Sequence, residues 1–218
     1  MVINKKEDFI KLTNEYEINP LIARLLANRG IVNKKEASLF LKGTVNDLND
    51  ASLMKDMKKA VSIIKGSIEE KKKIVIYGDY DCDGVCSTTI LYRTLKKLGA
   101  NFDYYIPNRE DEGYGMNSDR IRKLKSEGAE VILTCDNGIS AMEQVEVAKE
   151  LGLTVIITDH HDIPYIEKEG NRINVVPNSD CVINPKQGNC EYPFKELCGA
   201  GVALKFSMEL VNAMGRSR

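Results

Sequence analysis

The chain has 218 residues, of which 43% are hydrophobic and 29% charged, and its formal net charge is −1. This composition is that of an ordinary globular protein, and it excludes a low-complexity or strongly basic chain. We find no apolar run of transmembrane length, and the N-terminal sequence MVINKKEDF is too polar for a signal peptide. We therefore expect a cytoplasmic protein without a membrane partner. Its six cysteines lack zinc-like spacing, so we expect them to be reduced, buried and packed as small apolar residues.

Residues 1–70 predict a helical leader. The stretch NPLIARLLANRG, residues 19–30, carries apolar residues at helical spacing and ends at Gly30, which suits a helix C-terminus. The stretch ASLMKDMKKAVSIIKGSIEEKKK, residues 51–73, repeats this period. We interpret both apolar stripes as core packing rather than as ligand sites.

From residue 73 onward, short apolar segments alternate with amphipathic ones. The strands expected are KIVIYG at 73–78, NFDYYIP at 101–107, EVILTCDNG at 130–138, LTVIITDHH at 153–161 and a short CVINP at 181–185. The helices expected are 87–100, 118–129 with Ser118 as N-cap, 140–152 and 199–214. This order predicts an α/β fold, a parallel sheet with helices on both faces. Ligands of such sheets bind beyond the carboxyl ends of the strands.

Acidic and imidazole side chains follow three of these predicted strands directly. They are Asp79, Asp81 and Asp83 in GDYDCDG, Asp136 in CDNG, and Asp159 with the chain's only histidines, His160 and His161. Carboxylates gathered at one sheet edge would take up protons unless a cation neutralised them. Mostly oxygen donors, one or two imidazoles and no thiolate favour Mn²⁺ or Mg²⁺ over structural zinc.

Each motif alone has a simpler interpretation. CDNG is a common turn, GDYDCDG resembles part of a calcium loop without its later glutamate, and DHH could cap a helix. None of these explains why all three motifs lie at equivalent strand ends. There are enough ligands for two ions sharing a carboxylate, an arrangement that suits hydrolysis of phosphoesters or phosphoanhydrides. Gly84, at the start of the next helix, could offer a free amide to a phosphate oxygen.

With these residues in view, the chain resembles the DHH phosphoesterase superfamily. Its motifs match GDYDCDG, TCDNGIS and the Asp-His-His triplet at 159–161. The stretches NPLIARLLANRGI, LMKDMKKAV and IPNREDEGYGMN narrow the resemblance to the N-terminal part of the RecJ family, which are single-strand-specific 5′ exonucleases. The resemblance covers nearly the whole chain.

The resemblance implies a role for each matching residue. Direct metal ligands would be Asp81, Asp83, Asp136 as the bridge, and His160, with Asp79 as a further ligand or near-ligand. His161 would contact the scissile phosphate, and Asp159 would orient the histidines. Arg109 would contact a phosphate, although a surface ion pair with Glu110 or Glu112 is an equal alternative.

The resemblance also implies the function and its limits. We expect a Mn²⁺- or Mg²⁺-dependent 5′→3′ exonuclease acting on single-stranded DNA in repair and recombination, with a helicase and a single-strand-binding protein as possible partners. Residues 71–218 would be an incomplete DHH domain that lacks the family's fourth motif and its second, substrate-gripping domain, so the chain alone is expected to be poorly active. The alternatives are a hydrolase of oligonucleotides, cyclic dinucleotides or pyrophosphate, and a non-catalytic replication or repair scaffold.

Overall fold

The computed structural model describes residues 6–110 and 115–216. By its internal contacts the chain divides into two compact units, Met1–Asn49 and Asp50–Arg218. The first unit packs helices α1 (Lys6–Tyr16), α2 (Pro20–Asn28) and α3 (Lys34–Lys42) around a small core that includes Leu12 and Leu26, and ends in a 3₁₀ turn, η1 (Val45–Asp47). Asn19 and Asn33 cap α2 and α3 with their side chains. The helical character predicted for this region is confirmed.

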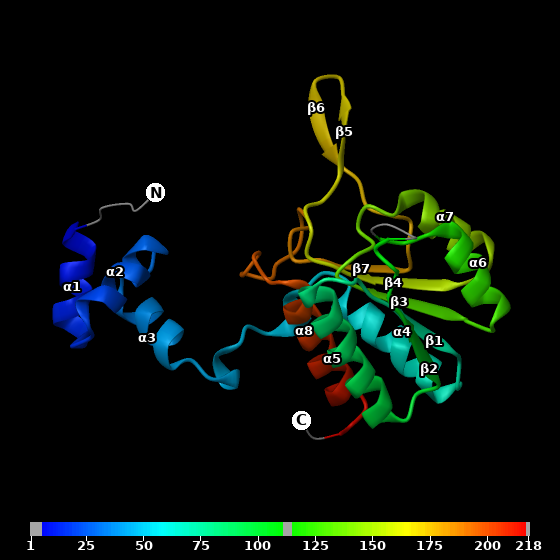
Figure 1. The fold of residues 1–218 in the computed structure, drawn as a ribbon, viewed down its shortest axis with the longest axis horizontal. Coiled ribbons are helices and arrows are strands. Elements are labelled where there is room, and N and C mark those ends of the chain that lie inside the picture. The colour runs from blue at the N-terminus through cyan, green and yellow to red at the C-terminus, as the bar shows by residue number, and fades with distance from the viewer. Residues whose placement is uncertain (1–5, 111–114, 217–218) are drawn as a thin grey trace. The chain divides into compact units, whose positions relative to one another are not determined.

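The second unit contains a five-stranded parallel sheet (Figure 1). Its elements are η2 (Ala51–Leu53), α4 (Met57–Glu69), β1 (Ile74–Tyr77), α5 (Cys82–Leu98), β2 (Phe102–Tyr105), α6 (Ser118–Ser126), β3 (Val131–Cys135), α7 (Met142–Glu150), β4 (Thr154–Thr158), the hairpin β5 (Tyr165–Lys168) and β6 (Asn171–Asn174), β7 (Cys181–Ile183) and α8 (Gly199–Ala213). The strand order is β2-β1-β3-β4-β7, with every pair parallel. The chain moves from β1 outward to β2 and then returns to the other side of β1. This reversal between β1 and β3 opens a crevice at their carboxyl ends.

Helices cover both faces of this sheet. Helices α4, α5 and α8 pack on one face, and α6 and α7 pack on the other (Figure 1). Strand β1 illustrates how both faces of the sheet are buried. Ile74 and Ile76 pack in the core beneath α4, α5 and α8, whereas Val75 and Tyr77 pack in the core beneath α6 and α7. Because the strand is buried on both faces, its sequence is continuously apolar instead of alternating. The α/β fold predicted from the sequence is confirmed.

Several boundaries differ from those expected. Helix α4, which we assigned to the leader, lies in the second unit, where its apolar stripe packs on α8 and β7. Asn117, not Ser118, caps α6, because the Asn117 Oδ1 atom accepts a hydrogen bond from the Arg120 amide at 3.0 Å. Helix α5 begins at Cys82, five residues before the predicted 87, because Asp81 provides its cap. The hairpin β5–β6 falls between the strands predicted at 153–161 and 181–185, where the sequence indicated no regular element.

The cysteines divide into two groups. Cys135, Cys181 and Cys190 are buried as expected, but the expectation was wrong for the other three, because Cys82 and Cys86 lie on exposed turns of α5 and Cys198 precedes α8. Among the described residues, no helix combines the length and apolar character needed to cross a bilayer.

Candidate active site

The loop after β1 supplies the first carboxylates of the site. Asp79 is 1% exposed, its Oδ1 atom has no hydrogen bond within the described part of the chain, and burial raises its pKa. Asp81 is exposed and caps α5, since its Oδ1 accepts from the Gly84 amide at 2.9 Å. A side chain on Gly84 would place Cβ 2.5 Å from the Asp79 carbonyl oxygen. Gly84 therefore lets α5 pack against Asp79, and its amide is engaged by Asp81 and is not free as the sequence suggested.

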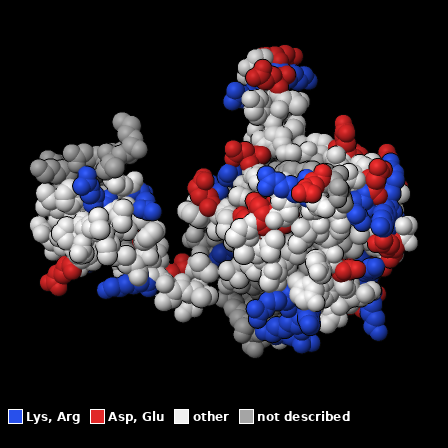
Figure 2. Space-filling view, viewed as in Figure 1, with Lys and Arg blue, Asp and Glu red and all other residues white. Residues whose placement is uncertain are grey.

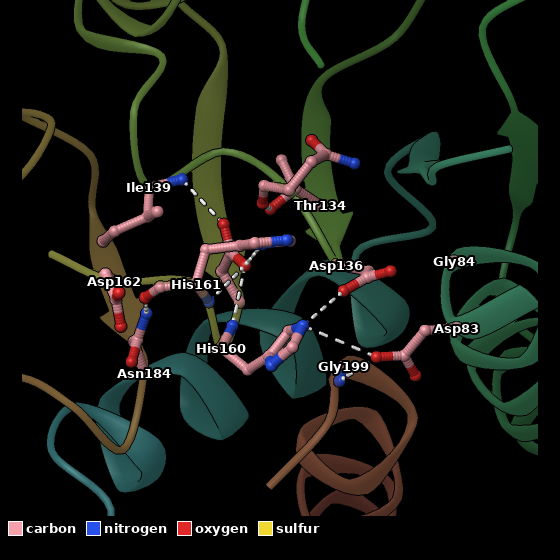
Figure 3. A network of polar contacts seen from close by, with 12 residues as sticks. Asp83, Gly84, Thr134, Asp136, Ile139, His160, His161, Asp162, Asn184 and Gly199 are labelled. Carbon is pink, nitrogen blue, oxygen red and sulfur yellow. Dashed lines mark hydrogen bonds and ion pairs between the residues drawn. The ribbon is translucent and has the colours of Figure 1, made fainter. Parts of the chain in front are cut away.

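The Asp83 side chain, unlike those of Asp79 and Asp81, is bonded to the start of α8. Its carboxylate accepts hydrogen bonds from the backbone N–H groups of Gly199 at 2.6 Å and Ala200 at 2.7 Å (Figure 3). These are the first residues of α8, where free amides and the helix dipole favour a negative charge. The contact fixes Asp83 and joins the start of α5 to the start of α8.

Asp136 lies at the centre of the site, directly after β3. Its backbone is left-handed, with φ of 62°, and its side chain is 1% exposed. Burial, followed by the nearby carboxylates of Asp83 and Asp81, raises the pKa of Asp136 to about 8. In the absence of a cation, the surroundings of this carboxyl therefore favour its protonated form.

The two histidines after β4 face different neighbours. The Nε2 atom of His160 lies 3.1 Å from Asp136 Oδ1 and 3.5 Å from Asp83 Oδ2 (Figure 3). The Nδ1 atom of His161 lies 2.7 Å from Asp159 Oδ1. His160 thus joins the carboxylate cluster, while His161 is paired with an aspartate of its own.

Asp159 is fully buried and organises this turn. Its Oδ1 also accepts from the amides of His160 and His161, and its Oδ2 accepts from the Ile139 amide at 2.9 Å. Burial alone would raise the pKa of Asp159, but the hydrogen bonds from His161 and Ile139 outweigh it and lower that pKa. The hydrogen bond between the His161 ring and Asp159 also raises the pKa of His161. The Asn184 side chain donates to the His161 carbonyl at 2.9 Å and supports the turn from β7.

Two triads of side chains can converge on a cation. One is Asp79, Asp81 and Asp136, and the other is Asp136, His160 and His161, with the ligand atoms of each triad within 4.8 Å of one another. Both contain Asp136, the residue expected to bridge. Asp83 belongs to neither triad, because α8 holds its carboxylate. Oxygen and imidazole donors fit Mn²⁺ or Mg²⁺, and a cation would relieve the repulsion that raises the Asp136 pKa.

A cavity of about 460 Å³ adjoins His161 and Asp159. Residues from the turn after β3 and from the segment before α6 form its walls, including Ile139, Ser140 and Met116. Arg109 lies outside this lining, with its guanidinium carbon 5.5 Å from the centre of the Tyr80 ring. Its phosphate-binding role stays a prediction, and Glu112 lies outside the described residues.

Sequence reasoning missed the start of α8. A Cβ atom added to Gly199 would lie 2.5 Å from Asp136 Oδ1, so this glycine gives Asp136 room while its amide holds Asp83. The only signal was the GAG triplet that opens the last predicted helix. Small residues at a helix start are common, so the triplet alone does not identify a contact with the first turn of α5, 116 residues earlier in the chain.

The Gly199→Ala variant is therefore expected to bind Mn²⁺ about tenfold or more weakly than the wild type, because Asp136 and Asp83 must both shift. Isothermal titration with MnCl₂ measures this loss. Gly201→Ala, in the same helix turn, is the control, since its added Cβ meets the flexible Leu197 side chain at 3.0 Å. Equal Mn²⁺ affinity in both variants would contradict a positioning role for Gly199.

Comparisons with known proteins agree with this geometry. The family model described as DHH family, N-terminal domain, matches residues 73–216. The single-stranded-DNA-specific exonuclease RecJ of Bacillus subtilis is 46% identical over 95% of this chain, and that of Escherichia coli is 35% identical over 89%. These alignments cover 25% and 32% of the two relatives, so the chain spans about a quarter to a third of their length.

Two solved structures of RecJ proteins also resemble this chain. A crystal structure of exonuclease RecJ bound to manganese superposes with a TM-score of 0.65 and 30% identity, over 75% of this chain and 39% of that one. The Mn²⁺ complex of RecJ from Thermus thermophilus matches all of this chain and 29% of its own length, with a TM-score of 0.68. At 24% identity, the second similarity supports the fold alone.

Proposed function

This chain belongs to the DHH family, and on that premise we propose that its site is the metal-dependent hydrolytic centre of a 5′→3′ exonuclease acting on single-stranded DNA. The observation that carries the proposal is the cluster around Asp136, in which two triads of ligands share one buried carboxylate beside the Asp159–His161 pair. Relatives with 46% and 35% identity are named single-stranded-DNA-specific exonucleases, which supports this choice of substrate.

We propose Asp79, Asp81, Asp136 and His160 as the residues that hold Mn²⁺ or Mg²⁺. When bound, such a cation supplies Lewis-acid activation of the phosphodiester and of the attacking water. Asp83 was also predicted as a direct metal ligand, but its carboxylate is bonded to the start of α8, 3.5 Å from His160, so its role as a ligand stays a prediction. The crystal structure of a relative bound to manganese supports this choice of metal.

We propose that His161 contacts the phosphate. The hydrogen bond that the His161 ring donates to Asp159 keeps this ring protonated to a higher pH, so it can stabilise negative charge on the phosphate or donate a proton to the leaving oxygen. Asp159 is then a positioning residue, held by three backbone amides from two turns. The cavity beside His161 provides room for the terminal nucleotide.

The test is release of 5′ mononucleotides from single-stranded DNA labelled at its 5′ end. Because the chain spans about a quarter of the Bacillus subtilis relative, the assay uses a chimera in which the 209 residues matched in that relative are replaced by this sequence. We expect Mn²⁺-dependent release by the chimera and none by its Asp136→Asn variant. Hydrolysis of cyclic dinucleotides or pyrophosphate instead of DNA would favour the other hydrolase interpretation, and no hydrolysis with Mn²⁺ bound would favour a scaffold.

A role in repair and recombination, and association with a helicase or a single-strand-binding protein, stay predictions. So do a cytoplasmic location and the assignment of residues 71–218 to an incomplete domain. Co-purification of this chain with a single-strand-binding protein, with and without DNA, tests the partner prediction.

The Arg109→Ala variant of the chimera is expected to raise the KM for DNA severalfold, and this measurement tests the predicted phosphate contact.

A further inference from the structure

The hairpin β5–β6 has no role in the site described above. Its strands pair in antiparallel register, with Ile166 opposite Ile173 and Glu167 opposite Arg172, and all eight strand residues are exposed. It projects from the carboxyl edge of the sheet, with a largely uncharged stem and charges gathered at the tip (Figure 2). Its strands contact chiefly each other, so this arm offers its surface to a ligand.

One face of the hairpin carries a tyrosine stacked with an arginine. Side chains alternate along a strand, so Tyr165, Glu167 and Arg172 share a face. The Arg172 guanidinium carbon lies 4.4 Å from the centre of the Tyr165 ring, and Tyr165 is 47% exposed. The arginine lies over one face of the ring and restrains its orientation, and the remaining ring surface is open to solvent.

Similar pairs flank the rest of the site. The Arg109 guanidinium lies over the Tyr80 ring at 5.5 Å, and that of Arg120 over the Tyr105 ring at 4.1 Å. Tyr80 follows β1, Tyr105 ends β2, and the hairpin follows β4, so all three pairs lie on segments at the sheet edge that carries the carboxylates. Flat aromatic and guanidinium surfaces are what single-stranded nucleic acids stack on.

The chain itself limits the distance from the hairpin to the site. Tyr165 follows His161 by four residues, and an extended chain spans at most about 3.6 Å per residue, so their Cα atoms are within roughly 14 Å. A single strand rises about 3.4 Å per nucleotide when stacked. A strand whose scissile phosphate is at His161 can therefore reach Tyr165 with about four nucleotides.

We propose that the hairpin is a base-stacking arm for single-stranded DNA, with Tyr165 as the platform and Arg172 as its support; this inference rests on the proposed function. Glu167, 3.9 Å from Arg172, and Glu169 balance the charges of Arg172 and Lys168. The face is therefore suited to bases and not to phosphates. Binding there is nearly independent of sequence and only weakly dependent on salt.

The test compares a long and a short oligonucleotide. Binding of fluorescein-labelled 5′-phosphorylated (dT)₁₂ and of the dinucleotide pdTpdT to the full chain is measured by anisotropy in Ca²⁺. Tyr165→Ala is expected to weaken binding of (dT)₁₂ about tenfold and to leave pdTpdT unchanged, because only the longer strand reaches the hairpin. Tyr165→Phe retains the ring and is expected to bind both as wild type does. Lys168→Ala, on the opposite face, is the control for charge.

A second readout locates the contact directly. Oligo(dT) carrying one 5-iodouracil is irradiated with the chain, and crosslinks to Tyr165 are expected at the third to fifth nucleotide from the 5′ end. Unchanged (dT)₁₂ affinity in Tyr165→Ala, or crosslinks confined to other residues, overturns the stacking arm. Because the chimera assay tests hydrolysis separately, a stacking arm that fails beside an active nuclease is distinguishable from failure of the proposed function.

Discussion

Replacement of His161 by alanine is expected to slow DNA hydrolysis by the chimera about a hundred- to ten-thousandfold while leaving its Mn²⁺ affinity within about threefold of wild type. The ring is paired with Asp159 at 2.7 Å and lines the cavity proposed for the nucleotide. Its loss removes the group proposed to contact the phosphate and leaves Asp79, Asp81 and Asp136 in place. Single-turnover release of mononucleotides and isothermal titration with MnCl₂ measure the two quantities.

His160→Ala is the matched contrast. The Nε2 atom of His160 is 3.1 Å from the shared carboxylate of Asp136, so we expect the main loss in Mn²⁺ affinity, with turnover recovering at high metal concentration. Equal losses of Mn²⁺ affinity in the two variants would show that both imidazoles are ligands, as the second triad allows.

The pH dependence tests the role of Asp159 in the same mechanism. Its hydrogen bond raises the pKa of His161, so the protonated ring persists above its ordinary pKa of about 6.5 and is lost as the pH rises through the raised value. In Asp159→Asn the basic limb of the rate profile is expected to move to lower pH. A mere loss of folding would lower the rate at every pH and leave the limb in place.

The sequence predicted the sheet and the edge on which the site lies. Strands such as β1 and β4 are continuous apolar runs that end in acidic motifs, and both signals are local in the chain. The rule that parallel strands end at one edge then placed Asp79, Asp136 and His160 together. Their meeting at one edge of the sheet followed from these local patterns, whereas the shared role of Asp136 in both triads was implied only by the family resemblance.

Contacts between distant segments could not be predicted in this way. Asp81 and Asp83 are equivalent in the sequence motif, yet one caps α5 and the other is held by α8, because neighbouring positions on a helix turn face different directions. The partner of Asp83 comes from a helix 116 residues later, and no periodicity encodes that pairing. The hairpin escaped prediction because its four-residue strands are exposed on both faces and lack a buried, apolar side.

The Asp136→Asn variant is expected to be more stable than the wild type without metal and to lose its response to Mn²⁺. Burial and the carboxylates of Asp83 and Asp81 raise the pKa of Asp136 to about 8, far above that of an aspartate in an unfolded chain. The folded protein therefore binds a proton that the unfolded chain releases, and the unfolding free energy of the metal-free protein falls as the pH rises from about 4 to about 8. Asparagine removes this charge, and it also tolerates the left-handed backbone at φ of 62°.

The rise of the pKa from about 4 to about 8 sets an upper limit of about 5 kcal/mol on the gain at pH 8, and each 1 kcal/mol raises the melting temperature in EDTA by roughly 2–4 °C. Addition of MnCl₂ should then raise the melting temperature of the wild type and not that of the variant, because the bridging ligand is gone. The melting temperatures of the wild type and the variant are measured by thermal unfolding at pH 5 and pH 8, each with EDTA or with MnCl₂. Asp103→Asn, on exposed strand β2, is the control and should match the wild type in each. A variant less stable than the wild type in EDTA at pH 8 would show that Asp136 is stabilised by its neighbours, and the proposed site would lose its strongest electrostatic argument for a cation.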